Sequence, residues 1–141
     1  MLSFYLPIVI IIGTNTLYNL STKNLPENVN AFASLTVTYV ISAIASYVLF
    51  LLNGKEKNII TEIGKMNIWS VVLGLAIVFL EYGFIAMYRA GWKISVGSLV
   101  ANVSVAIVLL LVGYLFYHEN ITLKQLLGVL ACAFGLYLLK G

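Results

Sequence analysis

Glu81 is the one ionisable side chain deep inside an apolar stretch of this chain, in the segment VFLEYG at residues 78–83. A charged group at the centre of a bilayer costs about 2.5–3.5 kcal/mol on insertion scales. Because a low-dielectric surrounding disfavours the charged form of a carboxyl group, Glu81 can hold a proton near neutral pH. Intramembrane acids are functional by default, so we predict that Glu81 binds protons or cations. Two other interpretations stay open: a neutral Glu81 bonded to a neighbouring helix, and an ion pair with Arg89 about two turns away.

Polar side chains recur at helical spacing on three apolar segments, which places each set on one helix face. The sets are Asn15, Tyr18, Asn19 and Thr22; Ser95, Ser98 and Asn102; and Gly74, Glu81 and Tyr88. Because polar groups avoid lipid, we expect the three stripes to converge. The functional interpretation is a solvated path for substrate and protons, lined by Asn15, Tyr18, Asn19, Ser98 and Asn102 together with Glu81. The alternative is interhelical hydrogen bonding that only holds the bundle together, worth ~0.6–2 kcal/mol per pair.

Other kinds of chemistry find little support in the sequence. His118 and Glu119 are adjacent, but the chain has no second His and no Asp, so no zinc site is expected. A single cysteine, Cys132, allows no disulfide framework. We recognise no phosphate-binding glycine loop and no Ser/His/acid set, and the basic residues form no run typical of nucleic-acid binding. We therefore expect no enzyme, no bound metal or cofactor and no nucleic-acid partner.

Apolar segments that could carry these residues fill the chain. Of its 141 residues 62% are hydrophobic and 9% are charged, against about 25% charged residues in soluble domains. A helical span needs ~20 mostly apolar residues, and five such spans are predicted within a single domain over residues 1–141. The spans are residues 2–21, 30–52, 68–88, 96–117 and 123–139. The fold class is thus an all-α integral membrane protein, and we expect it in the cell membrane, as a multi-pass protein of a prokaryotic plasma membrane.

Two helix starts are predicted from local signals. Residues 24–27, with a proline followed by a glutamate, indicate the start of the second helix. Thr122 and Gln125 have the spacing of a capping box, which indicates the start of the fifth.

The Lys and Arg residues divide equally between the two sides that five crossings create. One side holds Lys55, Lys57, Lys65 and Lys124, and the other holds Lys23, Arg89, Lys93 and Lys140. Orientation normally follows an excess of Lys and Arg on the cytoplasmic side, so the chain is predicted to insert both ways round. Two copies in opposite orientations would reproduce the inverted repeat of many transporters, with one chain forming one half.

Small residues form two further stripes, which let helices approach closely. They are Ser34, Thr38, Ser42 and Ser46 on the second span, and Gly128, Ala131, Cys132 and Gly135 on the fifth. We interpret both as structural, and the stripe on the fifth span serves either within the fold or between copies.

The chain resembles a single EamA domain of the drug/metabolite transporter superfamily. The resemblance lies in an aromatic-rich third helix, a fourth helix with small and polar residues, and a loop glutamate before the last helix. The matching segments are YGFIAMYR at 82–89, SVGSLVANVSVAIV at 95–108 and YHENITLKQLLG at 117–128. The matching single residues are Glu119 in the loop, Gly128 and Gly135 in the last helix, and Gly13, Thr14 and Asn15 in the first.

The chain is also similar to the small multidrug resistance family, whose members are antiparallel dimers of four-helix chains. Their essential carboxylate lies in the first helix, where this chain has Ile10 and Ile11, and the acid is on the third span instead. Together the resemblances imply a proton-coupled secondary transporter of a small organic metabolite or drug-like molecule, acting as an antiparallel homodimer in the lipid bilayer. The alternatives are a subunit of a lipid-linked sugar flippase and a membrane scaffold or regulatory subunit that transports nothing.

Overall fold

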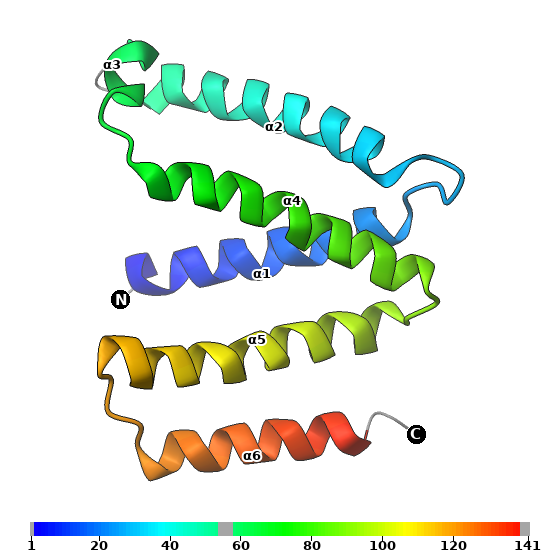
Figure 1. Cartoon of the computed structure of the whole chain (residues 1–141), viewed down its shortest axis with the longest axis vertical. Coiled ribbons are helices and arrows are strands. Elements are labelled where there is room, and N and C mark those ends of the chain that lie inside the picture. The colour runs from blue at the N-terminus through cyan, green and yellow to red at the C-terminus, as the bar shows by residue number, and fades with distance from the viewer. Residues whose placement is uncertain (1, 54–57, 139–141) are drawn as a thin grey trace. The chain divides into compact units, whose positions relative to one another are not determined.

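A computed structural model describes residues 2–53 and 58–138, and in this part the chain forms helices and no strand (Figure 1). The helices are α1 (Leu2–Lys23), α2 (Ala31–Asn53), α3 (Ile59–Ile63), α4 (Ile68–Arg89), α5 (Ile94–Tyr117) and α6 (Leu123–Leu138). Lys55, Lys57 and Lys140, and the predicted end of the last span at Leu139, lie outside the described residues.

Four of these helices are long and apolar enough to cross a membrane: α1, α2, α4 and α5, with 22, 23, 22 and 24 residues. The fifth apolar helix, α6, has 16 described residues, which at 1.5 Å per residue make about 24 Å. That is shorter than the hydrocarbon core of a bilayer, about 30 Å. The predicted all-helical membrane fold of about five apolar helices is confirmed, with α6 as its shortest member.

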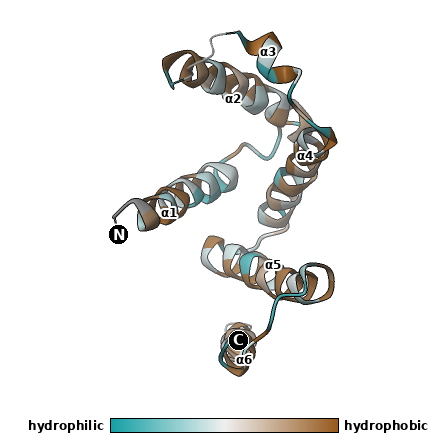
Figure 2. Ribbon diagram, turned by 90° about the vertical axis from the view of Figure 1, so that its left-hand side faces the viewer, coloured by the Kyte–Doolittle hydropathy of each residue, from teal (hydrophilic) through white to brown (hydrophobic). Residues whose placement is uncertain are grey.

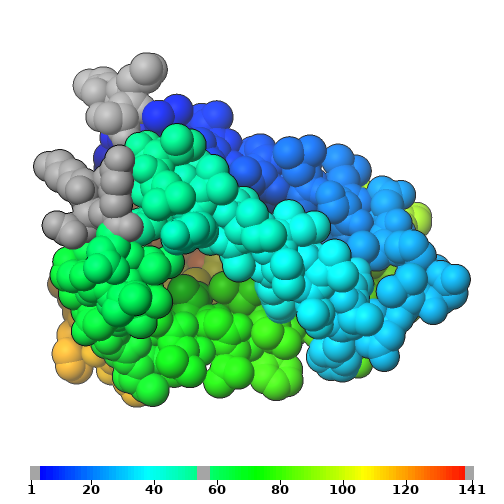
Figure 3. Space-filling view, turned by 90° about the horizontal axis from the view of Figure 1, so that it is seen from above, coloured from blue at the N-terminus to red at the C-terminus, as the bar shows by residue number. Residues whose placement is uncertain are grey.

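The chain divides into two compact units. One unit comprises residues 1–20 and 91–141, and so contains most of α1 together with α5 and α6. In this unit α5 packs against α6. The other unit comprises residues 21–90, in which α2 packs against α4, and Figure 3 shows the atoms of these two helices in cyan and green.

The second helix starts at Ala31, within one residue of the predicted span 30–52, and not at the helix-start signal predicted in residues 24–27. Residues 24–27 form a non-helical connection. The Asn30 Oδ1 atom accepts hydrogen bonds from the backbone N–H groups of Phe32 (2.9 Å) and Ala33 (3.3 Å). The helix-start prediction was wrong because a side-chain acceptor for the first free N–H groups decides where a helix starts, and Asn30 supplies that acceptor.

The last helix, α6, which corresponds to the fifth predicted span, begins as predicted. The backbone N–H of Thr122 donates to Gln125 Oε1 over 2.8 Å, and the N–H of Gln125 donates to Thr122 Oγ1 over 3.3 Å. This reciprocal pair confirms the capping box.

Aromatic and aliphatic side chains hold α2 against α4. Phe32 stacks on Tyr82, with ring centroids 4.8 Å apart and planes at 7°. Next to this stack Leu35 and Ile85 are buried, and Tyr39 packs against them. This apolar contact fixes which faces of α2 and α4 meet, and it therefore positions the groups that follow along the same faces.

Two cations join the α1–α2 connection to the end of α4. Lys23 Nζ donates to the Tyr88 carbonyl oxygen over 3.2 Å and lies 5.7 Å from the centre of the Tyr88 ring. Arg89 Nη2 donates to the carbonyl oxygens of Pro26 and Val29 over 3.0 and 2.7 Å. We call these contacts the cation clamp.

The clamp also excludes one of the three interpretations of Glu81, the ion pair with Arg89. Arg89 binds backbone carbonyls, and no ion pair between Arg89 and Glu81 is present in the described part of the chain. Lys65 and Glu62 form an exposed ion pair there.

Candidate functional site

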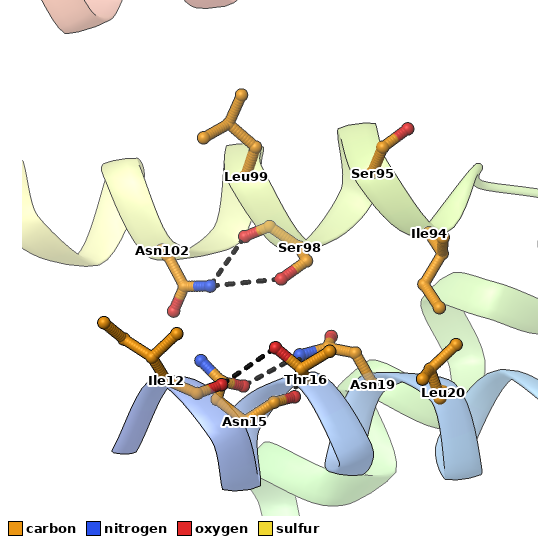
Figure 4. Close-up of a pocket in the computed structure, with 10 residues that line it drawn as sticks. All are labelled: Ile12, Asn15, Thr16, Asn19, Leu20, Ile94, Ser95, Ser98, Leu99 and Asn102. Atoms are coloured by element: carbon orange, nitrogen blue, oxygen red, sulfur yellow. Dashed lines mark hydrogen bonds between the residues drawn. The ribbon is translucent and has the colours of Figure 1, made fainter. Parts of the chain in front are cut away.

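A groove lies between α1 and α5 in the unit of residues 1–20 and 91–141 (Figure 4). Its volume is about 460 Å³, within the 300–1,000 Å³ typical of small-molecule sites. The lining residues are Ile12, Asn15, Thr16, Asn19 and Leu20 from α1, and Ile94, Ser95, Ser98, Leu99 and Asn102 from α5. The groove thus combines amide and hydroxyl groups with aliphatic side chains.

The polar wall on α1 follows from a change of composition along this helix. Its first half is hydrophobic and its second half is polar, as the colours of Figure 2 show. Asn19 Nδ2 donates to the carbonyl oxygen and to Oδ1 of Asn15, both over 2.8 Å. Thr16 Oγ1 donates to the Ile12 carbonyl oxygen over 2.8 Å. These i to i−4 bonds satisfy polar groups within the helix itself, so α1 can carry them through an apolar region.

The opposite wall repeats the same arrangement on α5. Asn102 Nδ2 donates to the Ser98 carbonyl oxygen over 2.8 Å and to Ser98 Oγ over 3.2 Å. Figure 4 shows the side chains of Asn102 and Asn15 directed into the space between the two helices. Each helix therefore presents an amide that its own helix holds in place.

A second polar feature, in the other unit, is the pair of Glu81 on α4 and Tyr39 on α2. The Tyr39 hydroxyl oxygen is buried without a hydrogen-bond partner of good geometry among the described residues, and the Glu81 carboxyl group is its electrostatic neighbour. Glu81 itself is partly buried. Because Tyr39 packs on the Leu35–Ile85 contact, the apolar packing of α2 on α4 brings this phenol to this acid.

Comparison with known families identifies the class of protein. A sequence model described as the EamA-like transporter family matches residues 4–140 of the 141-residue chain. The chain belongs to the EamA-like transporter family. The resemblance predicted from the sequence is confirmed. Comparison with curated proteins and with solved structures gave no match.

Membership of this family and the long apolar helices make the chain a multi-pass membrane protein of the transporter class. EamA-like proteins are transporters, and the polar groove lies between two of the four helices long enough to span the bilayer.

Four of the six predicted site residues of this EamA-like chain meet in the groove. They are Asn15, Asn19, Ser98 and Asn102. Tyr18 lies on α1 and Glu81 on α4, and neither lines the groove. The structure adds Thr16 and Ser95 to the lining. Ser95 belonged to the predicted stripe on α5, and Thr16 could have been found from its place beside Asn15 in the polar half of α1.

Tyr39 is the residue near Glu81 that sequence reasoning missed. It stands on α2 three positions before Ser42 and seven before Ser46, but the stripe that contains these serines was interpreted as structural. Its partner is 42 positions away along the chain, so only the packing of α2 on α4 reveals the pair.

Proposed function

We propose that this EamA-like chain is a proton-coupled secondary transporter of a small organic solute, with the α1–α5 groove as its binding site and an antiparallel homodimer as its working form. The observation that carries the proposal is a groove lined by amides and hydroxyls between two helices of a chain that belongs to a transporter family. In this proposal the solute crosses the membrane unchanged.

The polarity of the groove supports a role in solute binding. In a bilayer, polar side chains that face lipid raise the free energy, and those that face a cavity do not. Asn15, Asn19 and Asn102 have hydrogen bonds within their own helices, which satisfy part of their polar groups without a neighbouring helix. Interhelical bonding was the alternative explanation of these stripes, but the side-chain bonds from Asn19 to Asn15 and from Asn102 to Ser98 run within α1 and within α5. A path for solute accounts for polar groups kept in this position.

Glu81 supplies the proposed coupling site. A carboxyl group partly buried between apolar helices, with a phenol hydroxyl nearby, has within reach a group that could bond to either of its protonation states. The hydroxyl of Tyr39 can donate to the ionised acid and accept from the protonated acid. Such a pair can gain and lose a proton without leaving a buried charge entirely unpaired.

A second copy is proposed because α6 carries small residues that no other described helix covers. On α6, a Cβ atom added at Gly128 or Gly135 would meet nothing within 4 Å. Small residues that face open space suit close packing against another helix. The equal division of Lys and Arg supports opposite orientations for the two copies.

Proton flux through reconstituted protein tests the coupling. The chain is placed in liposomes that contain a pH-sensitive dye, and a panel of small organic solutes is added on one side. We expect at least one solute to move protons. Glu81→Gln keeps the shape and hydrogen-bonding capacity of the side chain but cannot ionise, so solute-dependent proton flux should vanish. Glu81→Asp should keep the flux with a changed pH profile.

Glu62→Gln is the matched control, because Glu62 is an acid on the short helix α3, in an exposed ion pair with Lys65. It should transport like the unmodified chain. Full gradient-driven flux in Glu81→Gln would reject proton coupling through this residue and leave it as a packing group.

A further inference from the structure

We infer that the α1–α5 groove accepts an uncharged solute bearing hydroxyl or carboxamide groups and excludes small ions. The inference rests on the proposed transport function and names the substrate class of the same groove.

The absence of charge from the lining is the first support. The ten lining residues are asparagines, serines, a threonine, leucines and isoleucines, and none of them is ionisable. An ion that enters must lose bound water, and without a countercharge nearby this desolvation raises its free energy strongly. A hydroxyl or carboxamide group loses less, because amides and hydroxyls of the groove can replace its bonds to water.

The hydrogen bonds on α1 fix the orientation of the Asn15 amide. Asn19 Nδ2 donates to the backbone carbonyl oxygen of Asn15, which can only accept. The same nitrogen also donates to the side chain of Asn15, so the atom that it meets there must be Oδ1. The two N–H groups of Asn15 Nδ2 then have no acceptor among the described residues. α1 thus offers a hydrogen-bond donor to the groove.

The corresponding argument on α5 gives an acceptor. Asn102 Nδ2 is the atom that faces its own helix, because it donates to the carbonyl oxygen of Ser98. Asn102 Oδ1 is therefore the atom that points away, and Figure 4 shows it directed toward the Asn15 nitrogen across the groove. A donor on one wall and an acceptor on the other match a hydroxyl or a primary amide, which both donates and accepts. An ammonium group could use only the acceptor, and a carboxylate only the donor.

The aliphatic residues complete the match. Ile12 and Leu20 on α1, and Ile94 and Leu99 on α5, line the same space. They give the carbon skeleton of a solute an apolar surface, while the amides bind its polar groups. The volume of about 460 Å³ suits a small molecule of this kind.

Thiol chemistry tests the charge preference without knowledge of the natural solute. Ser98→Cys is made in the full chain with the single cysteine removed by Cys132→Ala. The reconstituted protein reacts with four methanethiosulfonate reagents, which carry a methyl, a hydroxyethyl, a trimethylammonioethyl or a sulfonatoethyl group. Each rate is divided by the rate at Thr61→Cys, an exposed position on α3, which removes the intrinsic reactivity of the reagent.

We expect the hydroxyethyl reagent to react at Ser98→Cys at least about tenfold faster, after this correction, than either charged reagent, which is about 1.4 kcal/mol. Ser95→Cys should give the same order, and it serves if Ser98→Cys does not fold. Adding the isosteric change Asn102→Asp should make the cationic reagent the fastest. A charged reagent that equals the hydroxyethyl reagent at Ser98→Cys, or no reaction at either position, would overturn the inference.

A second experiment tests whether Asn15 donates a hydrogen bond to the solute. Asn15→Leu removes the donor of α1, so the advantage of the hydroxyethyl over the methyl reagent at Ser98→Cys should disappear. An unchanged advantage would contradict the role of Asn15.

Failure of this inference and failure of the proposed function are separable. If the hydroxyethyl reagent is not faster than the charged reagents but solutes still drive proton flux, the substrate class alone is rejected. If the hydroxyethyl reagent is faster but no solute drives proton flux, transport is rejected and the selectivity of the groove remains.

Discussion

Removal of the Arg89 side chain should release the α1–α2 connection. Arg89 Nη2 donates to two carbonyl oxygens of this connection, those of Pro26 and Val29. An alanine at position 89 can make neither of these two bonds. Because the contact is local, the first effect should be easier opening of residues 24–30, rather than unfolding of the whole chain.

The size of the effect follows from the two bonds. A hydrogen bond to a charged group contributes about 1.5–3 kcal/mol. Both bonds are exposed, and water can replace part of each, so we take a value below this range, about 1 kcal/mol for each bond and about 2 kcal/mol for both together. That corresponds to about a 30-fold increase in the opening equilibrium. Arg89→Lys keeps the charge but loses the planar fork that reaches two acceptors, and should give an intermediate increase.

Hydrogen exchange measured by mass spectrometry on the reconstituted protein checks this value. Peptides that cover residues 24–30 should exchange about 30-fold faster in Arg89→Ala. The matched control is Lys65→Ala, because the Lys65 side chain is 60% exposed and forms one ion pair, which contributes about 0.2–1 kcal/mol. It should leave residues 24–30 unchanged. Exchange in Arg89→Ala within about threefold of the unmodified chain, or equal to that in Lys65→Ala, would refute the clamp.

Four further predictions follow from other parts of the chain. Asn30→Ala should lower the free energy of unfolding by about 1 kcal/mol through loss of the α2 cap, whereas Asn30→Asp should keep it; thermal unfolding in detergent decides, and equal stability of all three proteins would contradict the cap. Tyr39→Phe removes only the hydroxyl beside Glu81 and should change the pH profile of proton flux; an identical profile would separate Tyr39 from coupling. Gly128→Leu should keep the helix content by circular dichroism but convert the dimer to monomer in light scattering, and an intact dimer would move the interface elsewhere. C-terminal reporters should be found on both faces of the membrane, and two lysines added beside Lys140 should bring this terminus to the cytoplasm; a single face before the addition would exclude dual insertion.

The sequence by itself determined the helices and the local geometry of the polar stripes. Composition and the length of the apolar runs were enough for a membrane fold, because a bilayer permits few ways to satisfy the backbone. The bonds from Asn19 to Asn15 and from Asn102 to Ser98 join positions four residues apart. Such bonds depend only on the period of the helix, so the spacing in the sequence already implied them.

Only the tertiary structure decided which helix faces which. The periodicity of α4 places Glu81 on one face, but it does not identify Tyr39 on α2 as the neighbour. Arg89 was a candidate partner for Glu81, and it binds carbonyl oxygens 60 and 63 positions away instead. The groove likewise needs α1 and α5 together, and its lining residues on the two helices are separated by more than 70 positions along the chain. Contacts of this kind depend on how whole helices pack against each other. The choice of partner helix depends on aromatic stacking and aliphatic burial summed over side chains of both helices. The spacing of residues within one helix therefore does not reveal its partner.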